Sequence, residues 1–406
     1  MSLVVLLLGT VGAADRAMAA PPSIGAPSAV LVEPATGDIV FQRRAGDRRA
    51  IASTTKLMTA LVVLDRLSLD DVLAHVPYRP GGAESLVGLR TGERMTVRDY
   101  LRGLLLASGN DAAQTLAVRT AGSRGAFVRL MNERAQKIGL RNTRFRTPVG
   151  LDAEGNYSTA SDLVALALVL RTDAFIRETL NRPDATLRVR GDRGRNIRVV
   201  NRNSLVRTVP FVDGVKTGHT SRAGFVLVGS ATRDGVTVLS AVLGTTSEAA
   251  RNRDSLALLR YGLERYQVVT AVKDGQRLAF ARIRFRGDGP PLALVASRTV
   301  RHTVRRGERL LTRVIGAPEQ VEGPLRKGAR LGTILVRQRG KTVDRVALVA
   351  ARAIPAATTT DRLSDYVRRS QTLLLLATLA GVSLLLVLLR RRSARRGDAR
   401  VEAETA

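Results

Sequence analysis

Three short segments of the chain contain residue types that carry out acyl transfer in enzymes. The first is Ser53-Thr54-Thr55-Lys56, at the start of a run whose apolar residues repeat with helical spacing. This spacing predicts a helix that begins near Ser53 and carries Lys56 one turn later on the same face. A serine hydroxyl is a weak nucleophile until a neighbour removes its proton, and a neutral lysine amine can do this whereas arginine stays protonated. The alternative is a serine that caps the helix beside a lysine on the surface.

The second segment is Ser108-Gly109-Asn110, which stands between two apolar runs. A second hydroxyl, that of Ser108, can relay a proton to a leaving amine, and the Asn110 amide can position both the lysine and a substrate. A turn between two helices explains the same residues without any chemistry.

The third segment is Lys216-Thr217-Gly218, which leads into the strand-like residues Ala223 to Ala231. On an edge strand, Lys216 can hold a carboxylate or polarise the relay serine, and Thr217 can bind the same carboxylate. Gly218 lets a substrate backbone approach closely. We also expect the Lys216 ammonium to lower the pKa of Lys56, because like charges disfavour each other.

The composition makes these lysines informative. The 406 residues include 65 Lys and Arg against 35 Asp and Glu, a net charge of +30, yet only six of the cations are lysines. Two of the six lie in these segments, in a chain that otherwise uses arginine. Such a charge can indicate a nucleic-acid partner, but 3% aromatic residues and no Trp disfavour a base-stacking surface. We expect no nucleic-acid partner.

Cysteine and histidine limit the remaining chemistry. The chain has no Cys and three His, so disulfides, thiolate metal sites and a cysteine nucleophile are excluded. None of the histidines has the spacing of a helical zinc site, and a zinc hydrolase is not expected. The sequence predicts neither a metal nor a cofactor.

In this order, the three segments resemble those of the penicillin-recognising serine transferases. More narrowly, they resemble the low-molecular-mass D-alanyl-D-alanine carboxypeptidases, serine peptidase family S11. The resemblance covers about Ser28 to Ile354, and longer stretches support it: residues 51–60, 108–112, 148–151, 157–160 and 212–220.

The resemblance implies a fold. The expected class is an α/β (α+β) catalytic domain of the penicillin-binding-protein and β-lactamase type, with an antiparallel sheet and helices. A small all-β domain and one C-terminal transmembrane helix follow it.

The resemblance also implies roles for individual residues. Ser53 would be the acyl-enzyme nucleophile, and Lys56 its general base. Ser108 and Asn110 would be the pair that relays a proton and positions the reacting groups. Lys216 would be the cation for the substrate carboxylate and for the relay, and Thr217 would help to bind the carboxylate. Gly218 would complete this substrate-binding segment. The backbone N–H groups of Ser53 and His219 would form an oxyanion hole. Arg251 would help to hold the terminal carboxylate; its alternative is a solvated helix cation.

The implied activity is removal of the terminal D-alanine from peptidoglycan stem peptides that end in D-Ala-D-Ala. It serves cell-wall biogenesis and cell shape, and β-lactams would inhibit it by acylating Ser53. One alternative is a β-lactamase, which needs a deacylating glutamate four residues before an asparagine; Glu178 stands only three before Asn181. A second is a non-catalytic protein that binds anionic wall polymer, since residues 268–354 contain 19 Lys and Arg against six Asp and Glu.

The two ends of the chain predict an exported protein that is held at the cytoplasmic membrane. The N-terminus has the apolar run and small-residue cleavage pattern of a signal peptide. Thr372 to Leu389 is uncharged and spans about 27 Å as a helix, close to the thickness of a bilayer core. The arginines that follow place the C-terminus in the cytoplasm and everything upstream outside. The expected segments are a signal peptide 1–20, a catalytic domain 28–267, a β-rich domain 268–354, a stem 355–371, a transmembrane helix 372–389 and a cytoplasmic basic tail 390–406.

Periodicity predicts several elements of the catalytic domain. Residues 29–32 and 39–42 form a hairpin, and residues 224–231 and 236–243 form paired strands. Helices are expected at residues 54–66, 125–138, 160–170 and 248–265.

Overall fold

The computed structural model describes residues 20–404 except 83, 192–193, 287–288 and 369. All but the last residue of the predicted signal peptide therefore lies outside the described residues. The chain divides into two compact units. The first contains the residues up to Val268 together with Thr303–Glu308, and the second contains Val269–His302 and the residues from Arg309 onward.

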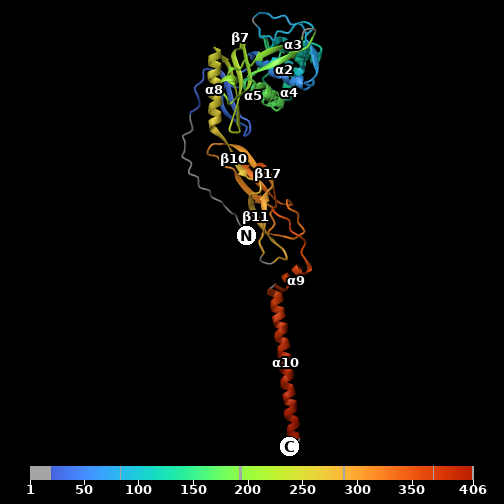
Figure 1. The fold of residues 1–406 in the computed structure, drawn as a ribbon. Coiled ribbons are helices and arrows are strands. Elements are labelled where there is room, and N and C mark those ends of the chain that lie inside the picture. Colours follow the sequence, from blue (N-terminus) through green and yellow to red (C-terminus); the bar gives the residue numbers. More distant parts are fainter. Residues whose placement is uncertain (1–19, 83, 192–193, 287–288, 369, 405–406) are drawn as a thin grey trace. The chain divides into compact units, whose positions relative to one another are not determined.

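A five-stranded antiparallel sheet forms the centre of the first unit (Figure 1). Its strand order is β2-β1-β9-β8-β7, which leaves β7 at an edge, as expected for the strand that carries Lys216. The strands are β1 (Ser28–Glu33), β2 (Asp38–Arg43), β7 (Val212–Thr220), β8 (Gly224–Arg233) and β9 (Val236–Thr245).

Helices cover both faces of this sheet because its strands are apolar on both sides. Along β8, Val226 and Val228 belong to one buried cluster, with residues of α5 (Ala160–Leu170). Leu227, between them, belongs to another cluster with residues of α8 (Glu248–Arg265). This alternation is the period-two pattern of a strand buried on both faces.

The remaining helices and strands of the first unit lie around the sheet. The helices are the 3-10 turn η1 (Ala52–Thr55), α1 (Lys56–Leu64), α2 (Val97–Leu105), α3 (Asn110–Ala121), α4 (Arg124–Lys137), α6 (Ala174–Leu180) and α7 (Ser204–Thr208). Of these helices, α7 packs with the α8 cluster through Leu205. Two small antiparallel pairs join β3 (Val72–Ala74) to β4 (Arg94–Thr96) and β5 (Asp184–Val189) to β6 (Arg195–Val200).

The periodic elements expected from the sequence are confirmed. The helices over 160–170 and 248–265 have the predicted bounds, and those near 54–66 and 125–138 differ by no more than two residues. Both predicted strand pairs form. Helices α2, α3, α6 and α7 of the first unit lie outside the predicted ranges. The apolar residues of α2 at 97, 100, 101, 104 and 105 nevertheless have helical spacing.

The second unit contains a six-stranded sheet, in keeping with the expected all-β module. Its order is β14-β16-β17-β12-β11-β15, and Leu294, Val336 and Leu348 lie in its buried core. The strands are β11 (Arg277–Ile283), β12 (Leu292–Ala296), β14 (Leu311–Ile315), β15 (Gln320–Val321), β16 (Arg330–Gln338) and β17 (Lys341–Ala350). A separate pair, β10 (Tyr266–Val272) and β13 (Val300–Arg305), contains residues of both units. The sequence-based boundaries of the catalytic and β-rich domains stay predictions.

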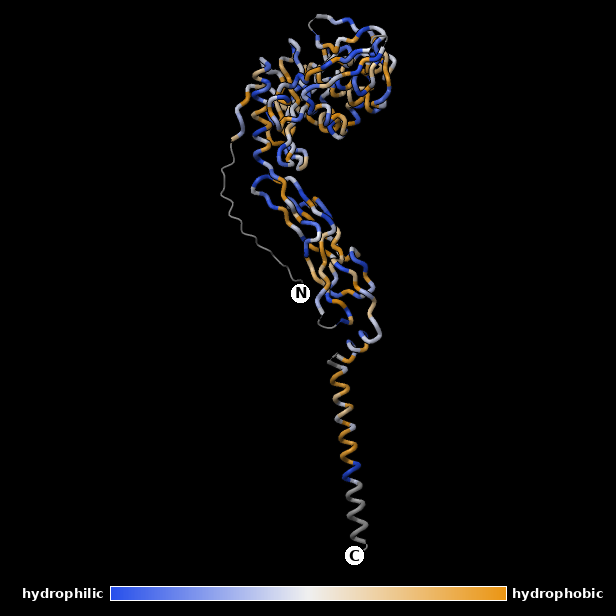
Figure 2. The backbone as a smooth tube through the Cα atoms, viewed as in Figure 1, coloured by the Kyte–Doolittle hydropathy of each residue, from blue (hydrophilic) through white to orange (hydrophobic). Residues whose placement is uncertain are grey.

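Two helices end the described chain. The predicted stem contains α9 (Thr359–Arg368), and α10 (Ser370–Glu404) follows. Within α10, Thr372–Ser393 has a mean hydropathy of 2.6 and none of its apolar window is buried, so it is long and apolar enough to cross a membrane. Figure 2 shows this apolar stretch and the hydrophilic residues that follow it.

Candidate active site

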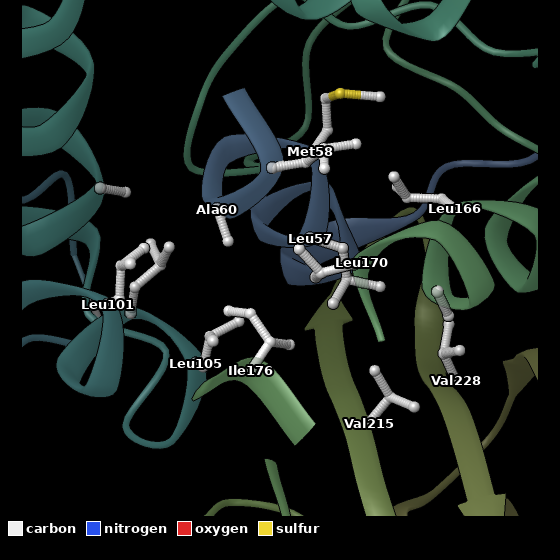
Figure 3. Close-up of a cluster of buried hydrophobic side chains, with 14 of the residues drawn as sticks. Leu57, Met58, Ala60, Leu101, Leu105, Leu166, Leu170, Ile176, Val215 and Val228 are labelled. Carbon is white, nitrogen blue, oxygen red and sulfur yellow. The ribbon is translucent and has the colours of Figure 1, made fainter. Parts of the chain in front are cut away.

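The helix that carries Lys56 is enclosed by the core of the first unit. All residues of α1 from Lys56 to Val63 are buried. Figure 3 shows Leu57 and Ala60 of this helix among side chains from α2, α5, α6, β7 and β8, including Leu101, Leu170 and Val215. Because interiors are close-packed, this environment fixes the position of α1 and of the turn before it.

Ser53 and Lys56 are in direct contact. Ser53 lies in η1, and Lys56 Nζ donates a hydrogen bond of 2.9 Å to its Oγ. The turn begins at Ala52, whose φ of +49° is in the left-handed region that non-glycine residues seldom adopt. The interpretation as a capping serine beside a surface lysine is therefore wrong, since no side chain caps the turn and Lys56 is buried.

Lys56 makes two further hydrogen bonds inside the protein. Its Nζ donates to Asn110 Oδ1 at 2.6 Å and to the carbonyl oxygen of Val149 at 2.5 Å. Burial lowers the pKa of Lys56 from 10.5 to about 7; the charge of Arg202 lowers it further, and that of Glu84 opposes the change. Loss of hydration is the main cause, and the Lys216 ammonium, which was expected to contribute, is not among the charges that change the Lys56 pKa. A large fraction of Lys56 is thus uncharged at neutral pH.

The Ser108 segment forms a turn between α2 and α3, and it also contributes to the site. Ser108 has a φ of +62°, a strained conformation of the kind found at functional positions. Its buried Oγ has no hydrogen-bond partner among the described residues. Asn110 is the first residue of α3, so the turn places its side-chain amide in hydrogen-bond contact with Lys56 Nζ.

The edge strand β7 brings the third segment against the same turn. Lys216, Thr217 and Gly218 are consecutive on β7, and the two polar side chains are buried. A Cβ atom at Gly218 would lie 2.9 Å from the backbone nitrogen of Ser53, so only glycine allows the strand to pack there. His219 comes next, exposed, with its ring stacked on that of Phe225 at 4.0 Å between centroids.

Positive groups gather around Lys216. Burial lowers the pKa of Lys216 well below 10.5, and the charges of Lys56, Arg202 and Arg251 lower it further. Arg251 is 4% exposed on α8 and hydrogen-bonds the side chains of Glu248 and Asn252. The alternative of a solvated helix cation is therefore wrong. Arg202 is exposed, whereas Lys56, Lys216 and Arg251 are buried. Basic groups gathered in this way favour an anionic ligand.

Two charged residues near Lys56 were not predicted from the sequence. Glu84 Oε2 accepts a hydrogen bond of 2.6 Å from Asn110 Nδ2, and Arg202 Nε donates to the carbonyl oxygen of Ala107, next to Ser108. Neither residue belongs to a recognisable motif: Glu84 lies in an irregular glycine-containing loop and Arg202 is one of many arginines. Only their contacts identify them.

Comparison with known proteins places the chain in a family. A family model described as D-alanyl-D-alanine carboxypeptidase, peptidase family S11, matches residues 15–247. The chain belongs to this family. Two relatives are the D-alanyl-D-alanine carboxypeptidases DacF of Bacillus subtilis and DacA of Escherichia coli. They are 31% and 32% identical over 78% and 86% of this chain, and over 83% and 88% of their own lengths.

Solved structures of the family have the same architecture. The DD-transpeptidase of Streptomyces K15 matches 60% of this chain and 99% of its own, with 33% identity and a TM-score of 0.58. Penicillin-binding protein 5 of Haemophilus influenzae matches 83% of this chain and 99% of its own, with 29% identity and a TM-score of 0.60. The expected fold class is confirmed.

The burial of Lys56 predicts a pH-dependent cost in stability. Its pKa is about 7 when folded and 10.5 when hydrated, so between these values the unfolded chain holds more protons and stability rises with pH. Replacing Lys56 by Met removes this dependence. The stability gained by Lys56→Met is its free energy of unfolding minus that of the wild type. This gain should be larger at pH 6 than at pH 9 by about 2–3 kcal/mol.

Denaturant unfolding of the detergent-solubilised chain at both pH values measures this difference. The exposed Lys137 of α4 supplies the matched control, Lys137→Met, for which we expect no change between the two pH values. A difference for Lys56→Met that is the same at pH 6 and pH 9 would show that the amine is hydrated in the folded protein.

Proposed function

We propose that the chain is a serine-type D-Ala-D-Ala carboxypeptidase that removes the terminal D-alanine from peptidoglycan stem peptides. The observation that carries the proposal is the buried Lys56 amine in hydrogen-bond contact with Ser53 Oγ, in a member of this family. This pair supplies what a serine acyl transfer needs: a nucleophile and a base that is uncharged near neutral pH.

The reaction proceeds in two steps. Lys56 takes the proton of Ser53 as Oγ attacks the carbonyl carbon of the D-Ala–D-Ala peptide bond. The oxyanion is stabilised by the backbone N–H groups of Ser53 and His219. The proton taken by Lys56 is relayed through the Ser108 hydroxyl to the nitrogen of the departing D-alanine, which leaves Lys56 neutral and Ser108 unchanged. D-alanine leaves, and water then hydrolyses the ester on Ser53 and regenerates the hydroxyl.

The cationic side of the site selects a substrate with a free carboxylate at its end. Lys216 and Arg251 bind this group, Thr217 adds a hydrogen bond, and the close packing at Gly218 keeps the strand beside Ser53. The charges of Lys56, Arg202 and Arg251 lower the pKa of Lys216, and a carboxylate bound among these groups offsets their repulsion and favours the charged form of Lys216, which supports this role. A β-lactam presents a carboxylate and a strained amide in the same way, so penicillin acylates Ser53.

The two alternative functions have less support. A β-lactamase needs a carboxylate that activates the deacylating water, but the Glu178 side chain is 62% exposed and pairs with Arg182 on the surface. A non-catalytic wall-binding protein has no use for a buried lysine held against a serine, an arrangement that costs stability.

Activity on a defined substrate tests the proposal. The full chain in detergent micelles is expected to release D-alanine from diacyl-Lys-D-Ala-D-Ala and to form a labelled penicillin adduct on Ser53. Ser53→Ala removes both activities. Lys56→Arg lowers kcat/KM by about 10³-fold because arginine cannot accept the proton, whereas Lys137→Arg has no effect. Neither D-alanine nor adduct from the wild type would refute the proposal, and fast penicillin turnover would favour the β-lactamase.

We further propose that the catalytic and β-rich domains lie outside the cytoplasmic membrane. The proposal takes residues 28–267 and 268–354 as these domains, 355–371 as the stem and 372–389 as the anchor. Support comes from the apolar length of α10 and from Arg390, Arg391 and Arg392, since basic residues mark the cytoplasmic side.

Protease treatment of intact spheroplasts tests this orientation. With an epitope tag after Ala406, external protease should degrade the catalytic domain and leave a protected, tagged fragment of the size of the anchor and tail. Complete protection of the catalytic domain, or loss of the tag without lysis, would contradict it.

A further inference from the structure

A carboxylate stands two hydrogen bonds away from the amine of Lys56. Asn110 lies between them: its Oδ1 accepts from Lys56 Nζ at 2.6 Å, and its Nδ2 donates to Glu84 Oε2 at 2.6 Å. The series Ser53–Lys56–Asn110–Glu84 is continuous, and its members come from η1, α1, α3 and the loop before β4.

Glu84 determines which end of the Asn110 amide faces Lys56. An ionised carboxylate only accepts hydrogen bonds, so it attracts the NH₂ end of the amide. The carbonyl end then points at Lys56 Nζ, which is a donor. Without the carboxylate, the amide is free to rotate and to present its NH₂ group to Lys56. This NH₂ group would face the donors of a protonated Lys56, or would occupy the lone pair with which the neutral amine takes a proton.

Three donors hold the Glu84 carboxylate in place. The backbone N–H of Gly81 donates to Oε1 at 2.8 Å, and the Tyr78 hydroxyl donates to Oε2 together with Asn110. Burial raises the pKa of Glu84, but the hydrogen bonds from Tyr78, Asn110 and Gly81 outweigh burial and lower it overall. Glu84 is therefore a carboxylate at neutral pH.

The loop that contains Glu84 is fixed to the start of α3. The carbonyl oxygen of Ser85 accepts from the backbone N–H of Asn110 at 2.8 Å. The buried Asp111 carboxylate accepts from the N–H groups of Val87, Gly88 and Leu89. The loop and the amide thus form one assembly, which holds Glu84 at a constant distance from Lys56.

The charges near Lys56 act in opposite directions. Burial is the largest influence and lowers its pKa; Glu84 and Asp111 raise it, and Arg202 lowers it. Lys216 is also near enough for its own pKa to be lowered by the charge of Lys56. A base works best with a pKa near the working pH, so a negative charge that offsets part of the burial and of the cations keeps the amine basic enough to take a proton.

We infer that Glu84 is a positioning residue for Lys56: its carboxylate fixes the Asn110 amide with Oδ1 toward the amine and places a negative charge behind the base. The role rests on the proposed function, in which Lys56 removes the proton of Ser53. Glu84 acts through Asn110 and the electric field.

Glu84→Gln and Glu84→Ala separate the charge from the hydrogen bond. A glutamine oxygen still accepts from Asn110 but carries no charge, whereas alanine removes both. Titration of the six lysine side chains by carbon-13 NMR, in the full chain in detergent micelles, gives the Lys56 midpoint directly; Lys56→Arg assigns the signal. We expect a midpoint near 7 in the wild type and one lower by roughly one pH unit in Glu84→Gln.

The rate of Ser53 acylation by labelled penicillin should change with the midpoint. Its rise with pH shifts to lower pH in Glu84→Gln, and the plateau rate of Glu84→Ala falls about tenfold below that of Glu84→Gln, because its amide is no longer oriented. The control is Glu319→Gln, the same change at an exposed carboxylate of the second unit, and it should follow the wild type in both measurements.

A Lys56 midpoint that is the same in Glu84→Gln as in the wild type would overturn the inference, as would equal plateau rates for the two Glu84 variants. If Glu84→Ala fails to fold, the titration of Glu84→Gln still decides. The NMR midpoint does not depend on activity. A wild type without D-alanine release would refute the proposed function, while the titration would still test Glu84.

Discussion

The candidate active site depends on one interaction: a lysine amine that is removed from water and held against a serine hydroxyl. Loss of hydration lowers the pKa of Lys56 to about 7, which turns an ordinary cation into a base at neutral pH. The 2.9 Å contact with Ser53 Oγ gives this base a proton to remove. Burial of an amine is unfavourable for folding, so the surrounding structure must be strong enough to impose it.

The fold provides this environment from three separate parts of the chain. α1 is enclosed between the central sheet and the helices beside it, which excludes water from Lys56. The turn at Ser108 places the Asn110 amide in hydrogen-bond contact with Lys56 Nζ. The edge strand β7 brings Lys216 close enough for the charge of Lys56 to lower the Lys216 pKa. Because β7 packs directly on the turn that contains Ser53, the turn and the strand that carries Lys216 are held against each other.

Several features of this arrangement were predictable from the sequence for physical reasons. Helical periodicity gave the bounds of α5 and α8, and the spacing from Ser53 to Lys56 is set by one helical turn. The scarcity of lysine drew attention to Lys56 and Lys216. These predictions depend on local spacing or residue type, which a single sequence records.

Other features depend on contacts between distant residues and were not predictable. Burial as the main cause of the lowered Lys56 pKa is a property of the packed core, whereas the sequence indicated only a contribution from the Lys216 ammonium. Glu84 reaches Asn110 from an irregular loop, and the positive φ angles of Ala52 and Ser108 occur at residues that normally avoid them.

The pH dependence of Ser53 acylation in the wild-type chain tests the central claim most directly. The second-order rate of adduct formation with a labelled penicillin, measured by rapid quench across the neutral range, should rise with pH as Lys56 loses its proton. This rise in the acylation rate should have a single midpoint near pH 7. A midpoint near 10, the ordinary value for a hydrated lysine, or a rate that does not change with pH, would contradict it.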